Sequence, residues 1–188
     1  PLDLSDSADT LLEPYQPVPG PLLAKAHDTA MRMEDAKARS TSLIMVARWY
    51  REAGKENEAL QCLDEAFAGQ GLDPDLPMLL DAAELYVRLH VPERAVPLLE
   101  KTAGSMPEVV KMEYSTARLE RLLRMSVLFH RAGKHARSVS LLGQIAERLD
   151  PREVVNHLKG LAMVAGAYEQ VGGDKKASKL IKQIEKSL

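Results

Sequence analysis

The chain has 188 residues, of which 45% are hydrophobic and 28% are charged, and its formal net charge is −2. These values predict a soluble folded protein and argue against a general nucleic-acid binder. The longest apolar run without a charge, residues 43–47, is far too short to cross a membrane.

The first segment, residues 1–21, has a composition unlike that of the rest of the chain. It holds five of the eleven prolines and four acidic residues, without a Lys or Arg. Proline removes backbone donors and disfavours helix in the residue before it. We therefore expect an acidic, Pro-rich arm that is extended or disordered. The alternative is that Leu11, Leu12 and Tyr15 dock on an apolar surface of the folded part.

The next segment, residues 22–37, is predicted to form a capping helix. Its apolar residues recur in steps of three and four along one helical face. No helix precedes this segment to pair with it. The residues that make up the face are Leu22, Leu23, Ala26, Ala30 and Met33.

Residues 38–188 divide into four predicted helix pairs. Gly54 suits the left-handed turn after a helix, and Pro92 suits the start of one. Pro97 lies about one turn inside its helix, so it should bend that helix or mark a later start. With the capping helix the prediction is about nine helices and no strands. The four pairs are expected at 38–70, 75–105, 107–149 and 151–188.

One phrase recurs in all four pairs: an aromatic residue, usually glycine four positions later, and a small residue nine positions later. Another small residue stands three before the aromatic, and large residues stand seven before and thirteen after it. Small side chains let two helices approach, and large ones fill the groove between them. A recurring period of this size indicates a helical repeat. The four copies are Tyr50-Gly54-Ala59, Tyr86-His90-Ala95, Phe129-Gly133-Ser138 and Tyr168-Gly172-Ala177.

This order of residues resembles the tetratricopeptide repeat (TPR) family over about residues 40–187. The resemblance implies an all-α fold, a right-handed superhelical array of antiparallel helix hairpins. The chain resembles a divergent, bacterial-type member of this family. It is divergent because leucine replaces the usual tryptophan and His90 replaces one glycine. The aromatic anchors are also spaced by 36, 43 and 39 residues, more than the unit of that family.

The sequence offers no candidate for catalysis. The five histidines lack metal-ligand spacing, since His130 and His135 are five apart across a predicted break. Cys62, the only cysteine, matches leucines in the other repeats and is expected to be buried. We therefore predict no catalytic residue, no metal and no cofactor, and a protein that is not an enzyme.

The TPR resemblance implies that the first helix of each pair lines a concave groove. The groove would be basic at the first repeat and apolar in the middle, which suits a peptide with apolar anchors and one acidic end. The same positions also hold Glu52 in the first pair, Val87 in the second, Arg131 in the third, and Ala162, Gly166, Glu169 and Gln170 in the fourth. The principal candidates are Ile44, Arg48 and Arg51 in the first pair, Leu80, Glu84 and Arg88 in the second, and Leu123, Val127 and His130 in the third.

The predicted function is a non-catalytic adaptor that binds a protein or peptide in this groove. The alternatives are a self-associating homodimer and a TPR fragment of a larger regulatory protein. These helix faces could also simply be solvated, or the acidic arm could fill the groove. A basic stripe of Arg118, Arg121 and Arg124 could contact an acidic partner, while RNA is disfavoured because aromatic residues are not interleaved with it. We favour the cytoplasm over export with a leader removed.

Overall fold

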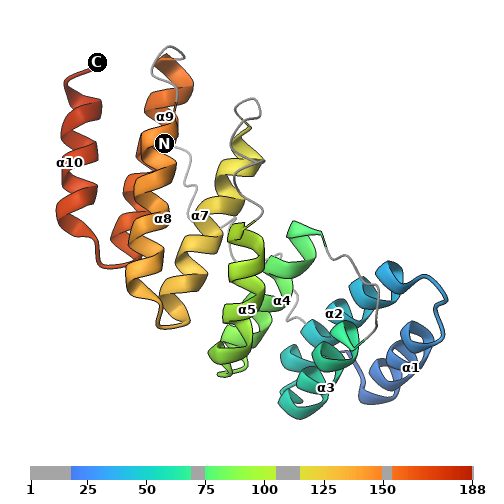
Figure 1. The fold of residues 1–188 in the computed structure, drawn as a ribbon. Helices are drawn as coiled ribbons and strands as arrows, with labels where there is room; N and C mark the ends of the chain where they lie inside the picture. Colours follow the sequence, from blue (N-terminus) through green and yellow to red (C-terminus); the bar gives the residue numbers. More distant parts are fainter. Residues whose placement is uncertain (1–17, 69–74, 105–114, 150–153, 188) are drawn as a thin grey trace, which may run out of the picture. The chain divides into compact units, whose positions relative to one another are not determined.

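The computed structural model describes residues 18–68, 75–104, 115–149 and 154–187. These residues form nine helices and no strand, which confirms the predicted all-α fold (Figure 1). The acidic arm before residue 18 and the expected opening of the third pair after Pro107 lie outside them. The helices are α1 (Gly20–Met31), α2 (Ala36–Glu52), α3 (Glu56–Phe67), α4 (Leu76–Arg88), α5 (Pro92–Gly104), α7 (Thr116–Arg131), α8 (His135–Arg148), α9 (Val154–Gln170) and α10 (Asp174–Glu185).

The chain divides into two compact units, residues 1–72 and residues 73–188. In the first unit α2 and α3 form a hairpin, and α1 packs on α2. The helix predicted over residues 22–37 is divided, because α1 ends at Met31 and α2 begins at Ala36. The carboxylate of Asp35 caps the start of α2 by accepting the backbone N–H of Ala38 at 2.6 Å. A 2.5 Å hydrogen bond between His27 Nε2 and Glu65 Oε2 joins α1 to α3.

The second unit contains three hairpins, α4–α5, α7–α8 and α9–α10. Their first helices are neighbours, because α7 packs against both α4 and α9 (Figure 1). Pro97 lies inside α5, which begins at Pro92, so the helix does not start later than this proline. The first helices of the second unit therefore lie in a row in the order α4, α7 and α9.

The recurring phrase builds the same turn in all four hairpins. The fourth residue after the aromatic has a left-handed backbone, with φ of 72° at Gly54 and 60° at His90. This conformation lets the N–H one position further on donate to the carbonyl of the aromatic residue, as in a Schellman turn. The N···O distances are 2.8 Å for Lys55–Tyr50, 3.0 Å for Val91–Tyr86, 2.8 Å for Lys134–Phe129 and 2.7 Å for Gly173–Tyr168.

The side chains at the recurring positions pack inside the hairpins. The four aromatic residues are buried, as are the small residues three before and nine after them. In the third repeat both small residues are serines, and the Ser126 and Ser138 hydroxyls lie 3.0 Å apart. The last helix departs from this pattern, because Ile181 at the thirteen-after position is 39% exposed.

Candidate partner-binding groove

A hollow of about 450 Å³ lies on the face of the second unit that the first helices of its hairpins form. Helices α4, α7 and α9 all contribute to it, since these helices pack side by side. The lining residues are Glu84, Leu123, Arg124, Val127, Leu128, Arg131, Met163, Gly166, Ala167 and Gln170.

The floor of this hollow is apolar. Leu123 and Val127 are one turn apart on α7, and Met163 and Ala167 are one turn apart on α9. Between them Gly166 leaves room, because a Cβ added there would meet nothing within 4 Å outside its own helix. The hollow therefore has unfilled space beside Gly166.

A charged network closes the α4 side of the hollow. Arg124 donates to Asp81 Oδ1 at 2.8 Å and, through Nε, to Glu84 Oε2 at 2.9 Å. Arg88 also pairs with Glu84. Burial opposes the charge on Arg124, but the hydrogen bonds to Asp81 and Glu84 outweigh this effect and raise its pKa. The carboxylate of Glu84 is thus neutralised from two sides.

Arg131 lies at the end of α7 and, with Arg124, is one of the two basic residues among the described residues that line the hollow. Its side chain is exposed, and no carboxylate among the described residues pairs with it. The adjacent His130 faces His135 across the turn, with 2.9 Å between their Nδ1 atoms. Burial, His135 and Arg131 lower the pKa of His130 below its ordinary value of 6.5.

The structure brings only some of the predicted groove residues together. Glu84, Leu123 and Val127 line the hollow, and Arg88 contacts Glu84. Leu80 is buried and does not line it.

The other predicted residues have different surroundings. His130 pairs with His135 and does not line the hollow. Ile44, Arg48 and Arg51 belong to the first unit, where Ile44 is buried and Arg48 is exposed. Arg51 is half-buried, and its Nε has no hydrogen-bond partner among the described residues.

Sequence reasoning missed four lining residues, namely Arg124, Leu128, Met163 and Ala167, because it took one narrow stripe from each helix. In the sequence Arg124 is part of a basic stripe suited to an acidic partner, whereas the structure pairs it within the protein. A signal for this pair existed. Asp81 and Arg124 stand at the same position, five before the aromatic, in consecutive repeats.

Two further features bear on the class of site. No group of three or more His, Cys, Asp or Glu residues within the described ranges is arranged to hold a metal ion. Of the helices that the structure describes, none is both long and apolar enough to span a membrane.

Comparison with solved structures identifies the class of fold. The chain is similar to a kinesin light chain repeat protein from Podosopora anserina, described as having nearly identical TPR-like repeats. The two are 19% identical with a TM-score of 0.61, over 89% of this chain and 84% of the other. A variant of the same protein gives 18% identity and a TM-score of 0.59 over the same shares. Neither a family model nor a curated protein sequence matches the chain. The fold is therefore that of a TPR-like helical repeat.

Proposed function

We propose that the protein is a non-catalytic adaptor that binds a segment of another protein in the α4–α7–α9 hollow. The observation that carries this proposal is an apolar floor with an open site at Gly166, built from three neighbouring first helices. Concave, mainly apolar surfaces with a few polar groups are the usual ligand sites of proteins. The TPR-like fold supports the same function, because repeats of this kind commonly present a binding face.

The charges around the hollow favour a segment with an apolar anchor and an acidic residue. Glu84 already has two arginine partners, whereas Arg131 has no carboxylate partner among the described residues. Arg131 follows Val127 by four residues on α7, a rise of about 6 Å along the helix. Two residues of an extended segment span a similar distance, about 7 Å. The acidic residue is therefore expected two positions from the anchor of an extended partner segment.

A selection of displayed random peptides on the full chain tests this proposal. The selected peptides should bind wild type and lose at least about tenfold in affinity when Gly166→Trp fills the hollow. The matched control Ala117→Trp places the same side chain at an exposed position of α7 outside the hollow. Peptides that bind Gly166→Trp as tightly as wild type would show that the hollow is not the site.

The acidic preference has its own test. Arg131→Glu should weaken the selected peptides about five- to tenfold, since it replaces an attraction of up to about 1 kcal/mol by a repulsion. Arg121→Glu is the control, because Arg121 is exposed on the same helix and does not line the hollow. Equal losses in both variants would indicate a general charge effect and would refute the role of Arg131.

Self-association is the second candidate function. Ile181 on α10 is 39% exposed at a position that is buried in the other three repeats. A homodimer that covered this residue would dissociate in Ile181→Lys, which light scattering would detect. A wild-type monomer at all concentrations would exclude this function.

A further inference from the structure

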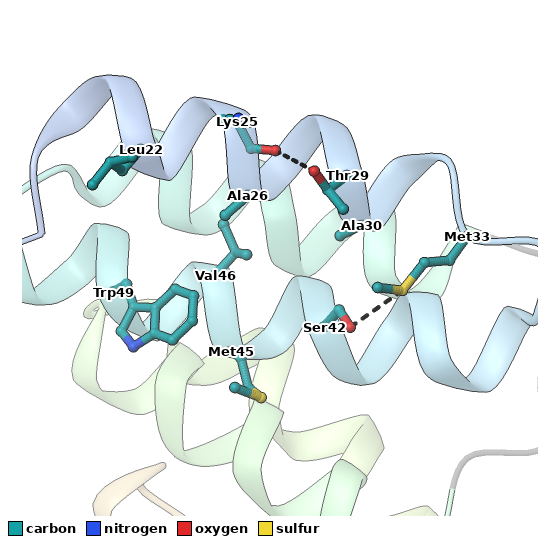
Figure 2. Close-up of a pocket in the computed structure, with 10 residues that line it drawn as sticks. All are labelled: Leu22, Lys25, Ala26, Thr29, Ala30, Met33, Ser42, Met45, Val46 and Trp49. Carbon is teal, nitrogen blue, oxygen red and sulfur yellow. Dashed lines mark hydrogen bonds between the residues drawn. The ribbon is translucent and has the colours of Figure 1, made fainter.

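The first unit has a second hollow, a furrow of about 400 Å³ between α1 and α2 (Figure 2). Among the described residues that line it most are apolar, and Lys25 is the only charged one. The residues that form the furrow are Leu22, Lys25, Ala26, Thr29, Ala30, Met33, Ser42, Met45, Val46 and Trp49.

The furrow exists because α1 presents small side chains where α2 presents larger ones, so the space between the helices is not filled. Ala26 and Ala30 on α1 are too short to fill the space beside Val46 and Trp49 of α2 (Figure 2). The hydroxyl of Ser42 donates to Met33 Sδ at 3.4 Å, which joins α2 to the connection after α1 at one end of the furrow. The furrow thus runs along both helices and stays open to solvent.

Large apolar side chains at the furrow are exposed. Leu22 is 56% exposed and Met45 is 48% exposed, while Trp49 is half-buried. A contiguous apolar patch of this kind is typical of an interaction surface. The ammonium group of Lys25 has no acidic partner among the described residues, so the occupant should combine apolar side chains with an acidic one.

We propose that the furrow is the docking site of residues 11–15 of the same chain. This segment, which lies outside the described residues, reads Leu11-Leu12-Glu13-Pro14-Tyr15. It supplies apolar side chains on both sides of a carboxylate, which is the chemistry that the furrow and Lys25 require. The arm that contains it has acidic residues and no basic one before α1.

The position of the segment in the chain makes this contact feasible. Leu12 precedes the first residue of α1, Gly20, by eight residues, which can span up to about 26 Å. The twelve residues of α1 are about 18 Å long, so a chain that turns back can reach any part of the furrow. A short tether also raises the effective concentration to the millimolar range, so modest contacts suffice.

Trp49 provides the experiment, because it is the only tryptophan of the chain and lines the furrow. In the full chain, Leu11→Ser combined with Leu12→Ser should shift the Trp49 emission to longer wavelength and increase its quenching by acrylamide about twofold. The control exchanges the other leucines of the arm, Leu2→Ser with Leu4→Ser, and should leave both signals at wild-type values. Unchanged circular dichroism would show that every variant is folded.

A charge exchange tests the pairing with Lys25. Lys25→Glu should reproduce the Trp49 shift, and adding Glu13→Lys should reverse it, while the control Lys179→Glu on α10 should have no effect. The proposal is overturned if the emission and quenching of Trp49 do not change when Leu11 and Leu12 are exchanged for serine. It is equally overturned if the emission depends on protein concentration instead, because a second copy would then occupy the furrow.

Discussion

His90 illustrates how a single residue can depart from a repeat without changing the backbone that the repeat requires. Its φ of 60° is close to the 72°, 76° and 71° of Gly54, Gly133 and Gly172, which occupy the same position in the other copies. Side chains with a Cβ are strained in this conformation, although histidine tolerates it better than most. The turn is therefore set by the packing of the hairpin and not by the presence of glycine.

His90→Gly should raise the free energy of unfolding by about 0.5–1 kcal/mol, because relief of backbone strain exceeds the added entropy of the unfolded chain. Gly54→Ala is the opposite exchange at the equivalent position and should lower the free energy of unfolding by about 1 kcal/mol. Urea denaturation of both variants measures these changes. A destabilised His90→Gly protein would mean that the imidazole contributes more than the strain costs.

His130 should titrate below 6.5, because burial, His135 and Arg131 all disfavour its protonated form. Since the unfolded chain then binds this proton more readily than the folded one, the residue lowers stability as the pH falls through 6.5. NMR of the imidazole resonances measures the pKa directly. His135→Asn removes an imidazole that lowers the pKa of His130 and should move that pKa upward, and an unchanged value would contradict the pairing.

At the scale of the element, each hairpin buries one small residue of the recurring pattern on each of its two helices, and the third hairpin shows the chemistry this allows. The Ser126 hydroxyl lies 3.0 Å from both the carbonyl and the hydroxyl of Ser138, and both serines are buried. The pattern predicts that these positions are small. It does not reveal that two polar residues satisfy each other where alanines stand in the other three repeats.

Ser126→Ala alone should cost about 1–2 kcal/mol of unfolding free energy, because the buried Ser138 hydroxyl loses its partner. Combining it with Ser138→Ala should recover most of this loss, since neither polar group then remains. A double-mutant cycle in urea measures the coupling, expected near 1 kcal/mol. Additive losses would indicate that the two hydroxyls do not depend on each other.

At the scale of the whole molecule, neighbouring hairpins of the second unit are joined by a charged network as well as by apolar packing. Arg124 of α7 binds both Asp81 and Glu84 of α4, and it is 38% exposed. In repeat proteins, stability depends on such contacts between neighbours. Because the same network neutralises Glu84, it also determines which charge of the hollow is available to a partner.

Arg124→Gln should lower the unfolding free energy of the full chain by about 1 kcal/mol, a modest value because solvent screens the pairs. The difference from wild type should shrink in 1 M salt, where the screening length is about 3 Å. The exposed Arg121→Gln serves as the control and should be neutral. An effect of Arg124→Gln that is independent of salt would assign the loss to packing.

The sequence by itself determines the helices and their pairing into hairpins. This is possible because each copy of the phrase specifies local events: a left-handed residue follows the first helix of the pair, and side chains such as Leu43 and Ala47 mark the buried face of that helix. Part of the hollow follows from the same register, since Glu84, Leu123 and Val127 stand at predicted groove positions and line the hollow, while their contact with a partner stays a prediction.

Only the tertiary structure decides which charges remain available and where the surface is hollow. In the sequence Arg124 reads as a basic residue available to a partner. In the structure it pairs with Glu84, because α4 and α7 lie side by side. The furrow beside Trp49 has no sequence pattern of its own, because its depth depends on how Ala26 and Ala30 face α2. Local patterns specify elements, whereas a hollow is the space that side chains of different elements fail to fill.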